Sequence, residues 1–472
     1  MKKVLIANRG EIAVRIIRAC HDLGLATVAV YSLADQEALH VLLADEAVCI
    51  GEPQAAKSYL KISNILAACE ITGADAVHPG YGFLSENANF ASICESCGLT
   101  FIGPSSESIA TMGDKIAAKQ LAKKVKCPVI PGSEGIIKDE AEGLKIAEKI
   151  GFPIVIKAVA GGGGRGIRIV KEKDEFFRSF SAARAEAEAG FNNPNVYIEK
   201  FIENPRHLEV QILGDKHGNY VHLGERDCTV QRRRQKLIEE TPSPILTPEL
   251  RAKVGKVAVD LARSANYHSV GTVEFLLDKD KKFYFMEMNT RIQVEHTITE
   301  EVTGIDLLKE QIYVAMGNKL TWKQKNIVFK GHVIQCRINA EDPSNNFAPS
   351  PGRLDYYLPP AGPSIRLDGA CYSGYAIPPY YDSMIAKVIS KGKNREEAIA
   401  IMKRALKEFH IGGVHSTIPF HQFMLDNPKF INSDYDINYV DHLLFPGEFL
   451  ILRNSLKVLV SRDPFSRLLS LC

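Results

Sequence analysis

Two rhythms of apolar positions divide the first 110 residues into alternating strands and helices. β-branched and aromatic residues gather in the runs KVLIAN, ATVAVYS, AVHPGYG and TFIGP, as in buried strands. Between these runs, apolar residues recur at helical spacing, which predicts helices over about 11–23, after Ser58 and up to Cys97. Strands that alternate with helices build a parallel sheet covered by helices, so we expect a parallel α/β unit here.

The same pattern continues along the chain with longer helices and isolated strands. It predicts helices over about 114–126, 174–189, 248–265 and 395–409, and a strand at VYIEKFI. The first of these helices is basic, and we interpret its lysines 115, 119, 123 and 124 as a solvated face. The segment GHVIQCRINAEDP then opens a third region, which is rich in proline and glycine to about Pro379.

Five glycines in six residues separate two strand-like runs in VIKAVAGGGGRGIRIV, residues 155–170. Each glycine costs roughly 0.5–1 kcal/mol relative to alanine, so a mobile surface loop is the weaker of two interpretations. The spacing of Gly161, Gly163 and Gly166 fits a dinucleotide fingerprint, but a strand follows where that motif needs a helix. We expect a hairpin tip that folds over phosphates, with Lys157 on the incoming strand within reach of them.

A second hairpin is predicted where VGTVEFLL and FYFMEMN flank the polar turn DKDKK. A turn centred between Asp280 and Lys281 places Glu274 opposite Glu287 and Leu276 opposite Phe285, with Asn289 on the face of Glu287. Facing carboxylates repel each other unless a cation lies between them. Two carboxylates and an amide oxygen suit Mg²⁺, and FYFMEM is too apolar for the alternative, an acidic hairpin in solvent.

Charged residues continue beyond this hairpin. Arg291 and Glu295 are candidates for a cation and a base, within the run Arg291, Gln293, Glu295 and His296. Upstream, ERDCTVQRRRQK contains Arg232, Arg233, Arg234 and Lys236. Such a run could bind nucleic acid, but it lacks interleaved aromatic residues, which favours an anion-binding strand or loop in a cleft.

Composition limits the class of protein. A chain of 472 residues predicts two to four domains, and a net charge of +2 offers no general argument for nucleic acid or a membrane surface. No run of 18 apolar residues occurs, so we expect no membrane span. Charged residues interrupt the apolar start, which predicts a strand and helix instead of a signal peptide, and hence a cytoplasmic protein. We interpret Cys94 and Cys97 as packed thiols, with redox or metal use as the alternative.

The glycine flap, the lysines and the carboxylate hairpin together resemble the ATP-grasp enzymes. ANRGEIA, HPGYGFLSEN, GGGGRG, MEMNTRIQVEH, CRINAEDP and PPYYDSM narrow the resemblance to biotin carboxylase over about residues 1–445. It implies an α/β protein of ATP-grasp fold, with a Rossmann-like parallel α/β domain, a glycine-flap lid and an α+β C-terminal region. The implied units are the N-terminal domain 1–112, a helical connection 113–130, the lid 131–203, the catalytic half 204–330, the C-terminal domain 331–445 and a tail of unknown role, 446–472.

The resemblance also implies roles for individual residues. ATP would contact Lys115, Lys157, Gly163, Gly164, Glu199, Lys200, Phe201, Ile202, His207 and Arg234, with adenine held by the backbone of 199–202. Two Mg²⁺ or Mn²⁺ ions would be held by Glu274, Glu287 and Asn289. Bicarbonate would be surrounded by Lys236, Arg291, Gln293, Val294 and Glu295. Glu295 would be the general base, and Arg337 would stabilise the deprotonated biotin.

The implied reaction is ATP-dependent carboxylation of biotin by bicarbonate through carboxyphosphate. It is the first half-reaction of acetyl-CoA carboxylase, in fatty acid synthesis, or alternatively of a pyruvate or other acyl-CoA carboxylase. The implied partners are a biotin carboxyl carrier protein, carboxyltransferase subunits and a second copy of the chain, without nucleic acid. Arg234 departs from the family's usual QRRHQK, since this chain has QRRRQK. Other hypotheses are an ATP-grasp ligase with another acceptor and a nucleotide-binding scaffold without catalysis.

Overall fold

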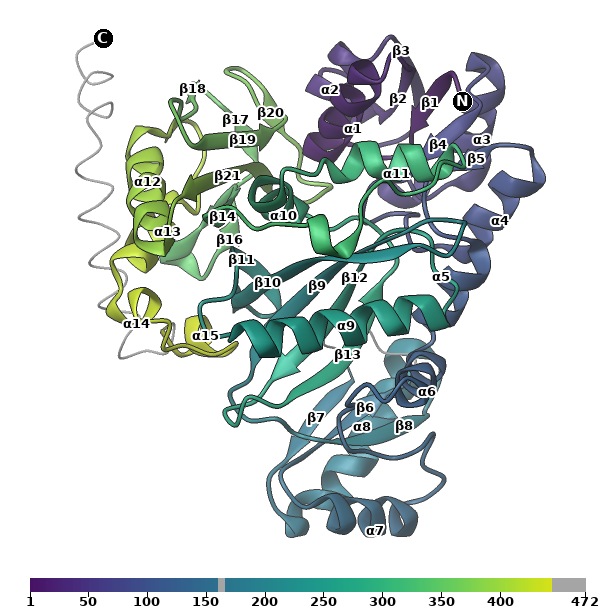
Figure 1. Ribbon diagram of the computed structural model, residues 1–472, viewed down its shortest axis with the longest axis vertical. Coiled ribbons are helices and arrows are strands. Elements are labelled where there is room, and N and C mark those ends of the chain that lie inside the picture. Colours follow the sequence, from purple (N-terminus) through teal and green to yellow (C-terminus); the bar gives the residue numbers. More distant parts are fainter. Residues whose placement is uncertain (160–165, 444–472) are drawn as a thin grey trace.

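The computed structural model describes residues 1–159 and 166–443 (Figure 1). Gly163 and Gly164 of the expected flap, and the tail from 446, lie outside the described residues. Three sheets organise the rest: a parallel sheet near the N-terminus, a small sheet at the opposite end of the long axis, and a large antiparallel sheet between them (Figure 1).

The N-terminal sheet is entirely parallel, as the alternating pattern predicts, with the order β3-β2-β1-β4-β5. Its strands are β1 (Lys3–Ile6), β2 (Ala26–Ser32), β3 (Glu46–Gly51), β4 (Ala76–His78) and β5 (Thr100–Phe101). Its helices are α1 (Gly10–Asp22), α2 (Leu39–Leu43), α3 (Ile62–Thr72) and α4 (Ala88–Ser96). β3 was not predicted, because its apolar run AVCI is short. It is an edge strand, and Glu46, Ala47 and Cys49 are exposed.

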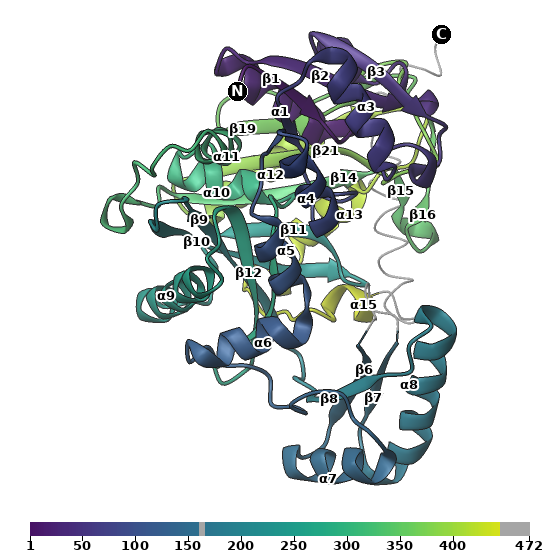
Figure 2. The ribbon, with the colours of Figure 1, turned by 90° about the vertical axis from the view of Figure 1, so that its right-hand side faces the viewer.

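Helices α5 (Ser106–Gly113) and α6 (Lys115–Lys124) lead to the small sheet, which projects from the body (Figure 2). This sheet has the order β7-β6-β8 and consists of β6 (Ile154–Ala158), β7 (Ile167–Val170) and β8 (Val196–Lys200), backed by α7 (Glu140–Ile150) and α8 (Phe176–Phe191). Phe176 and Phe180 of α8 are fully buried in its core. Because β6 and β7 pair in antiparallel fashion, the predicted hairpin on either side of the glycines is confirmed.

The large sheet contains eight strands in the order β13-β12-β9-β10-β11-β14-β21-β19. They are β9 (Arg206–Gly214), β10 (Tyr220–Arg232), β11 (Gln235–Thr241), β12 (Ser269–Leu277), β13 (Phe283–Asn289), β14 (His332–Asn339), β19 (Ile365–Gly369) and β21 (Met384–Gly392). All neighbouring strands are antiparallel. The sheet passes without a break from β11 to β14, so the expected boundary at 330–331 separates sequence regions that share one sheet.

Helices cover this sheet and close the C-terminal region. They are α9 (Pro248–Ser264), α10 (His296–Thr303), α11 (Leu307–Ala315), α12 (Arg395–Glu408), α13 (Ile418–Asp426), α14 (Pro428–Ile431) and α15 (Tyr439–Leu443). Short strands pair in β15 (Glu341–Asp342) with β16 (Ala348–Pro349), β17 (Gly352–Arg353) with β20 (Ala376–Ile377), and β18 (Tyr357–Leu358) with β22 (His410–Ile411). The predicted helices at 248–265 and 395–409 are therefore confirmed within a residue at each end.

The carboxylate hairpin has one register error in the prediction. Glu274 does lie opposite Glu287, but Leu276 lies opposite Tyr284, and Phe285 lies opposite Phe275. The predicted pairing of Leu276 with Phe285 is wrong because a β-bulge at Met286 adds one residue to β13. A register counted from the turn cannot reveal such an insertion, because the nearly continuous apolar run FYFMEM has no alternation that would mark it.

Candidate active site

A cavity of about 870 Å³ lies between the lid and the face of the large sheet. Within the described ranges, every residue that the sequence analysis assigned to a site lines it. They are Lys115, Lys157, Glu199, Lys200, Phe201, Ile202, His207, Arg234, Lys236, Glu274, Glu287, Asn289, Arg291, Gln293, Val294, Glu295 and Arg337. The fold thus brings together segments that lie far apart in the sequence.

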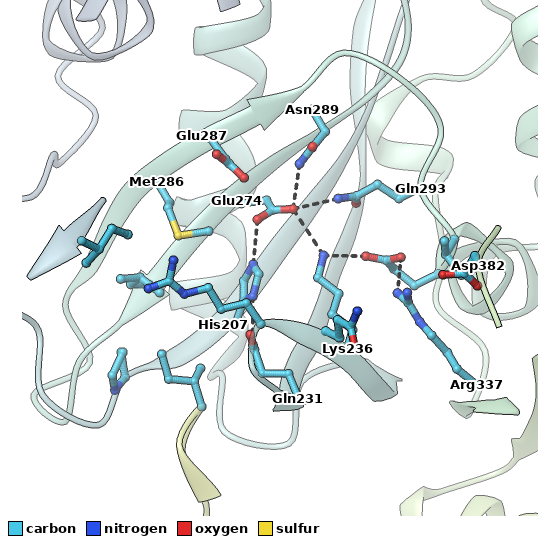
Figure 3. Close-up of a pocket in the computed structure, with 18 of the residues that line it drawn as sticks. His207, Gln231, Lys236, Glu274, Met286, Glu287, Asn289, Gln293, Arg337 and Asp382 are labelled. Carbon is cyan, nitrogen blue, oxygen red and sulfur yellow. Dashed lines mark hydrogen bonds and ion pairs between the residues drawn. The ribbon is translucent and has the colours of Figure 1, made fainter. Parts of the chain in front are cut away.

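The carboxylate hairpin forms one wall of this cavity (Figure 3). Glu274 is buried, and its Oε1 accepts hydrogen bonds from Asn289 Nδ2 at 2.7 Å and Gln293 Nε2 at 2.8 Å. Its other oxygen lies 2.9 Å from His207 Nε2. Desolvation by the cavity walls and the charge of Glu274 raise the pKa of Glu287. Two paired carboxylates and an adjacent amide oxygen suit a divalent cation.

A second group of charges centres on Glu295, at the start of α10. Lys236 Nζ lies 2.7 Å from Glu295 Oε1, and Arg337 Nη2 lies 2.8 Å from Glu295 Oε2. Burial alone would raise the pKa of Glu295, but these two cations hold it well below its usual range. The carboxylate is therefore ionised at neutral pH and is held from two strands, β11 and β14.

Two buried residues beneath this group were missed by the sequence analysis. Arg226 is fully buried, and its guanidinium donates to Gln293 Oε1 at 2.6 Å and to Glu209 Oε2 at 3.1 Å. Glu209 also contacts Lys236, while burial and the charge of Glu295 raise its pKa to about 7. Arg226 occupies the strand-like run ERDCTVQ, and an arginine inside a buried strand was the available signal.

The opposite end of the cavity combines cations with apolar walls. Lys157 Nζ lies 2.5 Å from Glu199 Oε2, and Lys119 contacts the other oxygen of Glu199. The expectation that Lys119 belongs to a solvated face is therefore wrong, because α6 packs beside β13 and turns this residue toward the lid. Apolar walls come from Val155, Ile169, Leu276, Met286 and Ile437. The bulge at Met286 brings one of these side chains into the cavity (Figure 3).

The backbone of β8 and its continuation borders these apolar walls. Lys200 directs its ammonium away from the cavity, to the carbonyls of Gly151 at 3.0 Å and Phe152 at 2.9 Å. Phe201 and Ile202 follow at the cavity edge. The Lys200 side chain is therefore committed to the lid, and the N–H groups of Lys200 and Phe201 donate to the carbonyls of Pro131 and Pro153. Contact of this backbone with adenine stays a prediction.

Arg291 connects the cavity to the N-terminal domain. Its Nε donates to Glu86 Oε2 at 2.9 Å, and its Nη2 donates to Asn289 Oδ1 at 3.0 Å. Glu86 also accepts the Thr290 N–H at 3.0 Å, so one carboxylate orients the start of the 290–295 loop. Glu86 was not predicted as a site residue, although it lies in the motif HPGYGFLSEN.

The three arginines of QRRRQK have different surroundings. Arg232 donates to Asn346 and stacks on Phe347, which gives it a packing role. Arg233 and Arg234 form the tip of the β10–β11 hairpin with φ values of 46° and 67°. Of the three, only Arg234 lines the cavity, so the expected anion-binding run is reduced to Arg234 and Lys236.

The cysteine pair of the N-terminal domain is not part of the cavity. Cys94 is buried in α4, and Cys97 directly follows that helix. Among the residues that the structure describes, no group with metal-binding spacing includes either thiol. Burial raises the pKa of Cys94 to about 12, as expected of a packed thiol.

A lid sheet facing a large antiparallel sheet, with paired carboxylates and lysines between them, defines the ATP-grasp class of ligases. Family models match residues 1–109 as "Biotin carboxylase, N-terminal domain", 114–323 as "Carbamoyl-phosphate synthase L chain, ATP binding domain" and 335–442 as "Biotin carboxylase C-terminal domain". The biotin carboxylase of Nostoc sp. is 58% identical over 441 residues, which are 93% of this chain and 99% of the relative.

Solved structures agree with this assignment. A complex of Campylobacter jejuni biotin carboxylase with β,γ-ATP has a TM-score of 0.90 at 48% identity, covering 93% of this chain and 98% of that one. The biotin carboxylase domain dimer of Hydrogenobacter thermophilus 2-oxoglutarate carboxylase, with MgADP, ADP and bicarbonate, has a TM-score of 0.89 at 48% identity, with 95% and 98% covered. The chain belongs to the biotin carboxylase family.

The family also includes proteins that serve another acceptor. A solved structure of the biotin carboxylase component of pyruvate carboxylase has a TM-score of 0.83 at 49% identity, covering 95% of this chain and 99% of that one. The proteins similar to this chain therefore include carboxylases that act on different acceptors. Within the described part of the chain, no helix has the length and apolar character to cross a membrane.

Proposed function

We propose that the protein carboxylates biotin on a carrier protein, using ATP and bicarbonate through carboxyphosphate. The observation that carries this proposal is the shared cavity, in which Lys236, Glu295 and Arg337 form one charged row beside the Glu274–Glu287 hairpin. The nucleotide and bicarbonate complexes of the similar solved structures support it.

We assign the nucleotide to the lid end of the cavity. Lys115, Lys157 and Arg234 would meet the phosphates, Gly163 and Gly164 would approach them as backbone, and the apolar walls with the 199–202 backbone would hold adenine. Glu274, Glu287 and Asn289 would hold Mg²⁺ or Mn²⁺, which when bound neutralises phosphate charge. Asn289 Oδ1 accepts one hydrogen bond from Arg291, and its second lone pair would be available to the ion.

We assign bicarbonate to the 291–295 loop and Lys236. Glu295 accepts the bicarbonate proton, and the freed oxygen attacks the γ-phosphorus as the bond to ADP breaks. Carboxyphosphate then breaks down to CO₂ and phosphate beside biotin, and the phosphate takes the proton of the ring N–H. Arg337 stabilises the enolate-like oxygen of the deprotonated ring, whose nitrogen attacks CO₂ to give carboxybiotin. The cations that keep Glu295 ionised also weaken it as a base. When Lys236 and Arg337 turn to the substrates, Glu295 regains basicity at the moment it is needed.

The partner proteins, and not this cavity, determine which molecule finally receives the carboxyl group. Similar proteins bear the names of free-standing biotin carboxylases and of pyruvate carboxylase. We propose acetyl-CoA carboxylase, with a biotin carboxyl carrier protein, carboxyltransferase subunits and homodimerisation, and retain pyruvate carboxylase as the alternative. The expected cytoplasmic location and absence of nucleic acid binding stay predictions.

The decisive experiment measures ADP release by the purified protein with Mg-ATP, bicarbonate and free biotin, each omitted in turn. Release that needs both bicarbonate and biotin is the expected result. Release that ignores biotin would indicate another ligase acceptor. Absence of release from a protein that still binds ATP would favour the scaffold hypothesis. Glu287→Gln is the matched control for the proposed metal site, because it keeps the size of the side chain but removes one negative charge.

A further inference from the structure

A lysine outside the cavity contacts the loop to which we assign bicarbonate. Lys387 lies on β21, and its side chain has no exposed surface. Its Nζ donates to the Val294 carbonyl oxygen at 3.1 Å and lies 3.0 Å from Glu11 Oε2. Asp368 Oδ2 is 4.0 Å away. A fully buried lysine is costly unless its charge is paired, so these contacts must account for its presence.

The sheet register places Lys387 directly beside Arg337. The two residues are partners across β14 and β21, and Asp368 is the partner of Lys387 on β19. Cross-strand partners project to the same face of a sheet, so two cations stand side by side here. Arg337 is paired with the carboxylates of Glu239 and Glu295, whereas Lys387 is paired with Glu11.

The two neighbouring cations hold two consecutive residues of the loop. Arg337 binds the Glu295 carboxylate, and Lys387 binds the Val294 carbonyl. The rest of the loop is fixed by other contacts: the Thr290 N–H by Glu86, and the Gln293 carbonyl by the His296 ring at 2.7 Å. Lys387 therefore fixes the backbone segment between the Gln293 amide and the Glu295 carboxylate.

Glu11 extends the contact to the N-terminal domain. It lies in the first turn of α1, is buried, and accepts a hydrogen bond from the Tyr81 hydroxyl. Burial raises the pKa of Glu11, and the nearby Lys387 ammonium opposes this shift. Through this pair, α1 is linked to the strand that holds the loop.

We propose that Lys387 is a positioning residue for bicarbonate, acting through the Val294 carbonyl, while Glu11 serves to neutralise its charge. This inference rests on the proposed function. It requires that the loss of the Lys387 hydrogen bond loosen the 293–295 backbone and weaken bicarbonate binding. The nucleotide, which is assigned to the other end of the cavity, should be affected far less.

Two variants separate the hydrogen bond from the ion pair. Lys387→Met removes both the charge and the donor to Val294, whereas Glu11→Gln removes the charge pair and leaves that donor in place. We expect Lys387→Met to raise the KM for bicarbonate about tenfold or more, with the KM for ATP within about twofold. Glu11→Gln should leave the KM for bicarbonate within about threefold.

A double variant addresses folding, since Lys387→Met leaves the Glu11 carboxylate buried without its partner. Glu11→Gln combined with Lys387→Met should recover thermal stability while the KM for bicarbonate stays raised. A return of that KM to the wild-type value in the double variant would overturn the inference. Equal losses toward ATP and bicarbonate in the single or the double variant would also overturn it. An inactive wild-type protein would instead contradict the proposed function, so the two failures are distinguishable.

Discussion

At the scale of single residues, two buried carboxylates of the cavity are each shared between two cations. Glu295 is held by Lys236 and Arg337, and Glu199 is held by Lys119 and Lys157. Each carboxylate therefore occupies cations that a substrate would need. Binding of phosphate or bicarbonate must exchange one anion for another, which keeps the cations compensated in both states.

Arg337 provides the sharpest test of a residue role. We expect Arg337→Ala to retain Mg-ATP binding within about twofold but to lower biotin carboxylation by about 10²–10³-fold, the loss typical of one preorganised donor to a developing oxyanion. Isothermal titration gives the first quantity and ADP release with free biotin gives the second. Arg337→Lys serves as a control that keeps the charge. A comparable loss of ATP affinity would mean that Arg337 maintains the cavity as a whole.

Lys157 predicts a pH dependence of nucleotide binding. Burial lowers its pKa to about 8, and the charges of Lys115 and Arg234 act in the same direction. The ammonium form binds phosphate, so ATP binding raises this pKa and is linked to proton uptake. The Kd for Mg-ATP should therefore be constant below a pH of about 8 and should rise above it.

Titration calorimetry between pH values of about 6.5 and 9.5 measures this dependence. Lys157→Arg should remove the rise, because arginine stays charged throughout this range. Lys119→Met is the matched control, since burial lowers the pKa of Lys119 as well, to about 7. A rise that persists in Lys157→Arg and disappears in Lys119→Met would reassign the titration to Lys119.

At the scale of elements, hairpins position most of the chemistry. The β12–β13 pair aligns its carboxylates, and the bulge at Met286 lets the strand present both Glu287 and an apolar side chain to the cavity. The β10–β11 hairpin carries Arg234 at its tip and Lys236 in β11, and both residues line the cavity. Its two tip residues are in the left-handed region, which glycine or asparagine usually occupies in such a turn.

Substitutions in this strained turn distinguish an effect on stability from an effect on ATP binding. Arg233 is exposed and lies outside the cavity, so Arg233→Asn should raise the free energy of unfolding by about 1 kcal/mol and leave ATP binding unchanged. Arg234→Asn should give a similar stability gain but raise the Kd for Mg-ATP severalfold, because a cavity cation is lost. Chemical denaturation and calorimetry measure the two effects. Equal ATP affinity in both variants would exclude Arg234 from the nucleotide site.

At the scale of the whole molecule, the lid and the large sheet enclose the cavity, and the N-terminal domain contacts its wall from outside. The lid contributes Lys157 and Glu199, and the large sheet contributes the carboxylates. The N-terminal domain contacts Arg291 through Glu86 and neutralises Lys387 through Glu11. The N-terminal domain contributes none of the residues that line the cavity, but its Glu86 contacts Thr290 and Arg291 at the start of the 290–295 loop. Its link to catalysis is therefore through positioning.

The tail allows one prediction at this scale. The matched family domains end at residue 442, and all assigned site residues precede it. Deletion of 446–472 should therefore leave the turnover of free biotin close to that of the full chain. Steady-state kinetics on both proteins is the measurement. A folded truncation without activity, judged by circular dichroism, would show that the tail is part of the enzyme.

The sequence by itself determined the parallel α/β start, the two functional hairpins and most of the charged residues that line the cavity. These follow from local periodicity and from motifs whose residues are contiguous, such as MEMNTRIQVEH. Tertiary structure decided which polar residues face each other, apart from the Glu274–Glu287 pair that the hairpin predicts. Arg226, Glu209, Glu86, Glu11 and Lys387 acquire their roles from partners in distant segments. Strand register, a single bulge and the packing of α6 set those distances, and none of the three leaves a periodic signal in the chain.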